Sequence, residues 1–270
     1  MTCELAIVGA GIMAEAIARG IISSGTLQPS AIIAVEISLQ RREIFQSQLH
    51  IQTVEDGEHA VKGARTILLC VKPFQMEHAL RELSPGPDEQ TLVISIAAGI
   101  SSAFIEKTLG QGKRSRVIRA MPNTPMLVGC GMVAIAAGTN ATANDLAEAR
   151  MLFASSAKVI EVTEEKMDAV TAVSGSGPAY FFFLTEQMIQ AGIEMGLSDE
   201  DARTLAIQTA AGAAKMMTDS EDSPAEHRQR VTTPNGTTQA AINYMEQQDW
   251  PRITKDALKA AARRSAEMGR

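Results

Sequence analysis

A short apolar run followed at once by a glycine-rich turn is the feature that most restricts the fold of this chain. Leu5 to Val8 has the composition of a buried strand, and Gly9 to Ala14 then reads G-A-G-I-M-A. A helical pattern continues through Ile22. Strand, glycine turn and helix in this order predict the first unit of a dinucleotide-binding domain. An ordinary tight turn would have the same letters.

Each position of this turn has a physical reason for its residue type. The first glycine permits the tight turn, the second lets a pyrophosphate approach the backbone, and the final alanine lets the helix pack on the strand. The start of the helix then offers free N–H groups to the phosphates. We therefore predict that a cofactor lies against Gly9, Ala10, Gly11, Ile12 and Met13.

An acidic residue, Glu36, follows the second expected strand, Ile32 to Val35. A carboxylate there accepts hydrogen bonds from the ribose hydroxyls of NAD and repels a 2′-phosphate. Arg41 and Arg42 come soon afterwards and are able to pair with that phosphate. A solvated strand end beside a helix face would explain the same residues. The carboxylate favours NADH slightly, and NADPH stays open.

Three later strands also end in turns that suit a cofactor. V-K-P closes the expected strand from Thr66 to Val71, S-I-A-A-G-I ends the strand from Thr91 to Ala97, and M-P-N-T-P follows the strand from Arg116 to Ala120. Small residues suit a flat ring that lies on backbone, and two prolines make a rigid polar loop. Plain turns would look the same. The predicted cofactor contacts are Val71, Lys72, Pro73, Ala97, Ala98, Gly99 and Asn123.

Strands and helices alternate as far as Lys158 to Val162, and only helices are expected afterwards. The pattern predicts an α/β fold with a Rossmann-type doubly wound sheet of about eight mostly parallel strands in residues 1–162. An all-α dimerisation and substrate domain is expected in residues 163–270. Ala179 to Met195 is apolar nearly all round, which predicts a subunit interface because a small domain cannot cover such a helix alone.

Two polar segments of the helical half carry hydroxyls. V-S-G-S-G-P-A-Y-F-F-F, from Val173 to Phe183, predicts a turn with exposed N–H groups ahead of a buried helix that starts at Pro178. T-T-P-N-G-T-T predicts a second polar helix start. Capped loops are the alternative reading. The candidate substrate-binding side chains are Ser174, Ser176, Thr237 and Thr238.

Composition and missing motifs exclude several classes of protein. A net charge of −6 argues against nucleic acid or an anionic membrane as partner. Cys3, Cys70 and Cys130 lie far apart and predict neither a metal site nor a disulfide. We see no signal peptide and no membrane span, so a cytoplasmic enzyme is expected.

The available side chains favour one kind of reducible bond. Neutral hydroxyls are poor general acids, and a ketone usually needs a His or Lys to move a proton. The four histidines lie outside the polar turns. A C=N bond is able to enter already protonated and accept hydride directly. We therefore favour an imine substrate over a carbonyl substrate.

The motifs together resemble one known family, Δ1-pyrroline-5-carboxylate reductase. G-A-G-I-M-A, V-K-P, S-I-A-A-G, R-A-M-P-N-T-P, A-V-S-G-S-G-P-A-Y and T-P-N-G-T-T occur in order over essentially the whole chain. The first motif is generic, whereas the last three together are specific. The resemblance implies reduction of L-1-pyrroline-5-carboxylate to L-proline, the last step of proline biosynthesis, with NADPH or NADH. It also implies a homodimer as the minimum unit, and we expect a higher homo-oligomer.

The resemblance also implies roles for individual residues. The substrate would lie between the S-G-S-G-P loop of one chain and the P-N-G-T-T loop of its partner. Thr238 would be the catalytic hydroxyl nearest the ring nitrogen, and the amides of Gly236 to Thr238 would hold the carboxylate. Many members have Gly where Asn235 stands, but Asn tolerates the same left-handed backbone. The implied substrate-binding residues are Ser174, Gly175, Ser176, Gly177, Asn235, Gly236, Thr237 and Thr238, with no metal.

Two other functions share parts of this pattern. A β-hydroxyacid dehydrogenase would need a catalytic Lys in the first helix after the domain junction, and Ala179 to Glu194 contains none. A dinucleotide sensor without catalytic activity would share the first domain, but it would not need two hydroxyl-bearing loops in the helical half.

Overall fold

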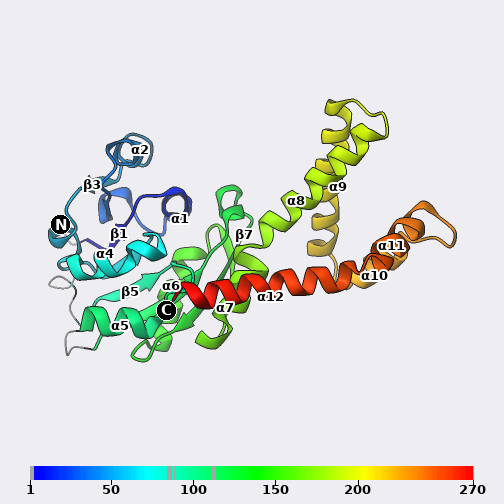
Figure 1. Ribbon diagram of the computed structural model, residues 1–270. Helices are drawn as coiled ribbons and strands as arrows, with labels where there is room; N and C mark the ends of the chain where they lie inside the picture. The colour runs from blue at the N-terminus through cyan, green and yellow to red at the C-terminus, as the bar shows by residue number, and fades with distance from the viewer. Residues whose placement is uncertain (1–2, 84–86, 88, 111–113, 270) are drawn as a thin grey trace. The chain divides into compact units, whose positions relative to one another are not determined.

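The computed structural model describes residues 3–83, 87, 89–110 and 114–269, and these divide into two compact units (Figure 1). The first unit contains Met1–Ser176 and Ala261–Arg270, and the second contains Gly177–Ala260. The sequence predicted a boundary between residues 162 and 163, directly after the last strand. The assignment of cofactor binding to residues 1–162 and of dimerisation and substrate binding to residues 163–270 stays a prediction. Each unit is described below by itself.

The first unit is built on an eight-stranded sheet in the order β3-β2-β1-β4-β5-β6-β7-β8. Neighbouring strands are parallel except β6 and β7, which are antiparallel. This confirms the predicted doubly wound, mostly parallel sheet. The strands are β1 (Leu5–Val8), β2 (Ile32–Val35), β3 (Gln52–Val54), β4 (Thr66–Leu69), β5 (Leu92–Ser95), β6 (Arg116–Met121), β7 (Gly131–Ala137) and β8 (Ala157–Glu161).

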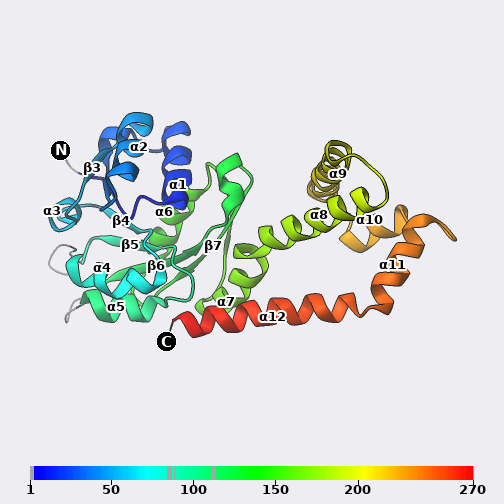
Figure 2. The same cartoon turned by 45° about the horizontal axis from the view of Figure 1, so that its top comes forward.

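Helices of the first unit cover both faces of the sheet (Figure 2). Its α-helices are α1 (Ile12–Ser23), α2 (Leu39–Leu49), α3 (Glu58–Val61), α4 (Met76–Leu83), α5 (Ser102–Gly110), α6 (Ala143–Phe153), α7 (Met167–Val170) and the end of α12 (Trp250–Met268). Short 3₁₀ turns are η1 (Pro29–Ala31), η2 (Pro73–Gln75), η3 (Thr124–Val128) and η4 (Glu164–Lys166).

The central strands are buried on both faces because alternate side chains point to opposite sides of a strand. Leu5 and Ile7 of β1 join the core that also contains residues of α1, α2 and α6. Ala6 and Val8 join the core against α3, α4 and α5. Continuous apolar runs therefore form strands here, since no face of the sheet centre is left for water.

The second unit is entirely helical, as predicted. It contains α8 (Gly177–Glu194), α9 (Asp199–Asp219), α10 (Pro224–Arg230), α11 (Thr237–Gln247) and the first part of α12. The Ser198 hydroxyl accepts the N–H of Asp201 at 3.1 Å and caps α9. Within the described residues, no helix is long and apolar enough to cross a membrane.

Most apolar side chains of the second unit are exposed in the single chain. Within residues 177–260, all of which the structure describes, the only buried residues are Gly177, Gly192, Ala202 and Ala206. Phe182 of α8 is 68% exposed, and its neighbours on either side are similar. A unit with this little core needs another surface to cover it.

The C-terminal segment packs within the first unit, on the turn that follows β5. The Ser265 hydroxyl donates to the Asp168 carboxylate at 2.7 Å. Gly99 has φ +77°, and a Cβ there would lie 2.5 Å from the Ser265 carbonyl oxygen and 2.9 Å from the Met268 Cβ. Glycine at this position therefore satisfies both a left-handed backbone and a close approach by the end of α12.

We predict that Gly99→Ala destabilises the protein more than Gly63→Ala. Gly63 has nearly the same φ, +78°, but nothing lies within 4 Å of its Cβ position. Both variants lose about 1–2 kcal/mol of unfolding free energy to backbone strain. Overpacking adds about 1–3 kcal/mol at Gly99 alone. Urea unfolding measures the unfolding free energy of both variants. Equal losses of unfolding free energy would contradict the packing described for the C-terminal segment.

Candidate active site

The turns that carry the predicted cofactor residues meet at one edge of the sheet. They follow β1, β4, β5 and β6, which are consecutive and parallel in the sheet, so their carboxyl ends lie side by side. The order of connection reverses between β1 and β4, which is the place where open α/β sheets bind ligands. The structure therefore brings residues 9–13, 71–73, 97–99 and 123 to the same edge.

The glycine turn after β1 is tight on one side and open on the other. Gly9 has φ +92°, and a Cβ there would lie 3.1 Å from backbone atoms of Cys70 and Val71 at the end of β4. Gly11 precedes α1, and nothing lies within 4 Å of its Cβ position. No side chain caps the first N–H groups of α1. The chain thus offers free backbone donors at a place where a phosphate has room to approach.

Side chains from the region after β2 hold the middle residue of this turn from both sides. The N–H of Ala10 donates to Glu36 Oε2 at 2.7 Å, and Arg41 Nε donates to the Ala10 carbonyl at 2.6 Å. The other oxygen of Glu36 accepts the N–H of Ser38 at 2.9 Å. The turn is therefore fixed in shape by the protein itself.

One member of this cluster, Glu15 in the first turn of α1, was not foreseen from the sequence. Its carboxylate pairs with Arg19 at 2.7 Å and with Arg41 at 2.8 Å. Partial burial alone would raise the pKa of Glu15, but hydrogen bonds from these arginines hold that pKa below its ordinary value. The sequence pattern that could have identified Glu15 is an acidic residue in the first turn of a helix, four residues before Arg19.

The turns after β4 and β5 differ in accessibility. Lys72 is exposed beside Pro73, and its predicted contact with the cofactor stays a prediction. Ala97 and Gly99 are buried, and Ala98 is half-buried. Packing of the C-terminal segment accounts for glycine at position 99 without a cofactor, and the predicted cofactor contact there stays a prediction.

Asn123, after β6, joins two of the predicted motifs. Its Nδ2 donates to the Ser174 carbonyl at 3.2 Å and to the Ser174 hydroxyl at 3.4 Å. Its Oδ1 accepts the N–H of Met132 at 2.9 Å. A Cβ on Gly175 would overlap the end of the Met121 side chain. The M-P-N loop therefore positions the S-G-S segment.

The prediction of a turn ahead of a new helix at this segment was wrong. Thr171–Gly175 forms a π-helix, η5, that continues α7, and α8 begins at Gly177 rather than at Pro178. The N–H of Ser176 donates to the Thr171 carbonyl at 2.8 Å, so it is not free for a ligand. Single π-turns inside helices are frequent at functional sites.

The P-N-G-T-T segment belongs to the second unit and starts α11. Asn235 has φ +58°, the left-handed conformation expected for it, and its N–H donates to Gln239 Oε1 at 2.8 Å. The N–H of Gly236 donates to the Thr233 carbonyl at 3.0 Å, and the carboxylate contact implied for this amide stays a prediction. Thr237 and Thr238 occupy the first two positions of the uncapped helix, where N–H groups lack intrahelical acceptors.

Among the described residues, no three His, Cys, Asp or Glu side chains gather in a way that would hold a metal ion. Burial raises the pKa of the Cys70 thiol, which disfavours the reactive thiolate.

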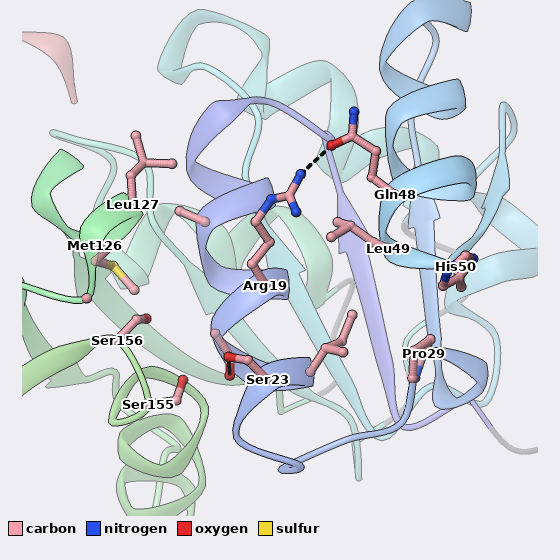
Figure 3. Close-up of a pocket in the computed structure, with 14 residues that line it drawn as sticks. Arg19, Ser23, Pro29, Gln48, Leu49, His50, Met126, Leu127, Ser155 and Ser156 are labelled. Carbon is pink, nitrogen blue, oxygen red and sulfur yellow. Dashed lines mark hydrogen bonds between the residues drawn. The ribbon is translucent and has the colours of Figure 1, made fainter.

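A cavity of about 430 Å³ lies beside the middle and end of α1 rather than at its glycine turn (Figure 3). Its lining includes Arg19, Leu49, Met126 and Ser156. The Ser156 hydroxyl is buried and has no hydrogen-bond partner among the described residues. None of the predicted site residues lines this cavity.

Comparison with known proteins decides the family. A family model described as pyrroline-5-carboxylate reductase dimerisation matches residues 164–268, and one described as coenzyme F420-dependent NADP oxidoreductase matches residues 4–99. A pyrroline-5-carboxylate reductase of Synechocystis is 39% identical over the full length of both chains. The chain belongs to the pyrroline-5-carboxylate reductase family. The resemblance read from the motifs is thereby confirmed.

Solved structures of this family agree with the fold. A pyrroline-5-carboxylate reductase from Coxiella burnetii superposes with a TM-score of 0.90 at 34% identity and full coverage of both chains. The Plasmodium falciparum pyrroline carboxylate reductase, solved with NADP bound, gives a TM-score of 0.88 at 27% identity, covering 99% of this chain and 98% of that one.

We predict that Asn123→Ala lowers catalytic activity about tenfold or more, because the S-G-S segment loses its anchor and small displacements of reacting groups slow reactions steeply. The matched control is Asn140→Ala, which removes an amide that donates to the Ser115 carbonyl at 3.3 Å. Each substitution should lower the free energy of unfolding by about 1 kcal/mol for every hydrogen bond that it removes. Steady-state kinetics with both variants would contradict the positioning role if their activities fell equally.

Proposed function

We propose that this chain reduces L-1-pyrroline-5-carboxylate to L-proline with a reduced nicotinamide dinucleotide. The observation that carries the proposal is full-length identity of 39% to a pyrroline-5-carboxylate reductase. Presence of the family's specific motifs, S-G-S-G-P and P-N-G-T-T, supports it. Because both motifs are intact, we extend the activity named for the relatives to this protein.

The sheet edge fits a dinucleotide. Gly9, Gly11 and the uncapped start of α1 would hold the pyrophosphate, and Glu36 lies where a ribose would be held. When bound, the reduced nicotinamide supplies the hydride. The residues after β4, β5 and β6 would hold its other end, with Asn123 keeping the S-G-S segment in place.

The hydroxyls available to the substrate suit a C=N bond. Ser174, Ser176 and Thr238 are neutral donors, and none replaces the His or Lys that a ketone reduction usually requires. An imine that enters protonated takes up hydride at carbon and keeps its proton on nitrogen. Thr238 would hydrogen-bond to that nitrogen, while the N–H groups of Thr237 and Thr238 at the start of α11 would hold the carboxylate.

Two chains would make the working enzyme. The second unit buries only four of its own residues, and the family model that covers it is described as a dimerisation domain. We propose a homodimer in which the P-N-G-T-T segment of one chain serves the other chain's S-G-S segment, and dimers that associate further.

We predict that Thr238→Ala lowers turnover of pyrroline-5-carboxylate about a hundredfold, the usual effect of removing one hydrogen-bond donor from a reacting centre. Cofactor binding should persist, because Thr238 lies outside the first unit. Thr218→Ala removes another helical threonine hydroxyl, which donates to the Lys215 carbonyl, and should leave activity unchanged.

The assay follows oxidation of NADH and NADPH separately, with and without pyrroline-5-carboxylate. Substrate-dependent oxidation with either cofactor supports the proposed function. Binding of a cofactor without any oxidation would favour the dinucleotide sensor instead, and unchanged kinetics in Thr238→Ala would remove Thr238 from the reaction.

A further inference from the structure

We propose that the cavity beside α1 is a second small-molecule site, which takes a small carboxylate whose apolar body carries a further hydrogen-bonding oxygen. Its volume of about 430 Å³ falls within the range of about 300–1,000 Å³ that small-molecule sites occupy. The lining residues all belong to the described part of the first unit, and none of them is acidic. The proposal does not depend on the proposed reductase activity.

A buried serine hydroxyl is one polar group of the cavity. Ser156 is 6% exposed, and its hydroxyl has no hydrogen-bond partner among the described residues. Its backbone is fixed, because its N–H donates to the Phe153 carbonyl at 3.2 Å and its carbonyl accepts the N–H of Gly131 at 2.9 Å. Most buried hydroxyls in proteins are paired, so an oxygen of a ligand in the cavity would supply the partner that Ser156 lacks.

The residue of α1 that faces this hydroxyl is a glycine. A Cβ on Gly20 would lie 2.8 Å from the hydroxyl oxygens of both Ser155 and Ser156. Glycine weakens a helix relative to alanine, but here it makes room for two hydroxyls against α1. Figure 3 shows both serines on one side of α1 and the end of α2 on the other, so the cavity extends across the helix.

Arg19 gives the cavity a positively charged donor. Its Nε and one terminal nitrogen donate to Glu15 Oε1 at 3.0 and 2.7 Å, and the same terminal nitrogen donates to Gln48 (Figure 3). The other terminal nitrogen has no hydrogen-bond partner among the described residues. Glu15 also pairs with Arg41 at 2.8 Å and therefore neutralises Arg19 only in part. A carboxylate would form a charge-assisted hydrogen bond with the remaining nitrogen.

Much of the remaining lining is apolar. Leu49 and Met126 are buried side chains of the lining, whereas Leu127 is 52% exposed. An apolar ligand body would cover Leu127 and gain the free energy of removing that surface from water. A carboxylate at Arg19, an apolar body along the leucines and a second oxygen at Ser156 together match the lining.

The test is calorimetric titration of the full-length protein with 4-hydroxybenzoate and with its neutral amide, 4-hydroxybenzamide. The acid should bind with a Kd of about 1 mM or tighter, and the amide at least about tenfold more weakly because it lacks the charge. Equal binding of acid and amide would overturn the assigned ligand class. Absence of binding by the acid would overturn the site.

A bulky substitution at Ser23 tests where the acid binds. Ser23 is an exposed lining residue in the last turn of α1, so Ser23→Trp should fill the cavity without entering the core and should abolish binding. The matched control is Ser47→Trp, at an exposed serine of α2 that lies outside the lining, and it should bind normally. Binding that survives Ser23→Trp would place the acid elsewhere, such as the proposed substrate site, and would overturn the inference.

A second pair of variants tests recognition of the charge. Arg19→Gln should weaken binding of 4-hydroxybenzoate about tenfold. Arg81→Gln is its control, because Arg81 also pairs with a glutamate four residues earlier, Glu77, at 2.6 Å, and it lies outside the cavity. Equal affinities of the two variants would contradict the role of Arg19. Reductase activity is measured separately, so failure of this site would leave the proposed function standing.

Discussion

The helical second unit cannot cover its own apolar side chains, and the rest of the structure depends on a partner surface that covers them. Its helices bury little beyond two glycines and two alanines, while Phe181, Phe182 and Phe183 stand exposed on α8. Exposed aromatic rows of this size mark interaction surfaces in soluble proteins. A second chain of the same kind would cover them, as the dimerisation family model implies. Association is then a condition for stability as well as for completing the proposed active site.

The first unit solves a different problem, which is to present backbone donors to a charged ligand in a rigid arrangement. Parallel strands place four turns at one edge, and the Ala10 peptide groups are held there by Glu36 and Arg41. A turn fixed in advance loses less entropy when a dinucleotide binds.

Local sequence signals were enough for much of this architecture. Strand patterns in the sequence placed β1, β2, β4, β5, β6 and β8, and G-A-G-I-M-A placed the turn after β1, because both depend on neighbouring residues alone. Contacts between distant residues decided the rest. The sequence S-G-S-G favours a turn, but the segment forms a π-helix, in which Ser174 contacts Asn123 and Gly175 lies against Met121. Gly99 resembles a cofactor turn in the sequence, whereas its close neighbour is the far end of the chain.

The central claim, that each active site needs two chains, is tested most directly by mixing two disabled chains. Gly11→Val should block the pyrophosphate site without disturbing the fold, since nothing lies within 4 Å of the Gly11 Cβ position. When Gly11→Val and Thr238→Ala chains are mixed in equal amounts, each mixed dimer has one intact site out of two. If chains pair at random, about half of the symmetric dimers are mixed, so activity should return to about a quarter of the wild-type value. Activity of the mixture that stays at the sum of the two separate variants would show that each chain completes its own site.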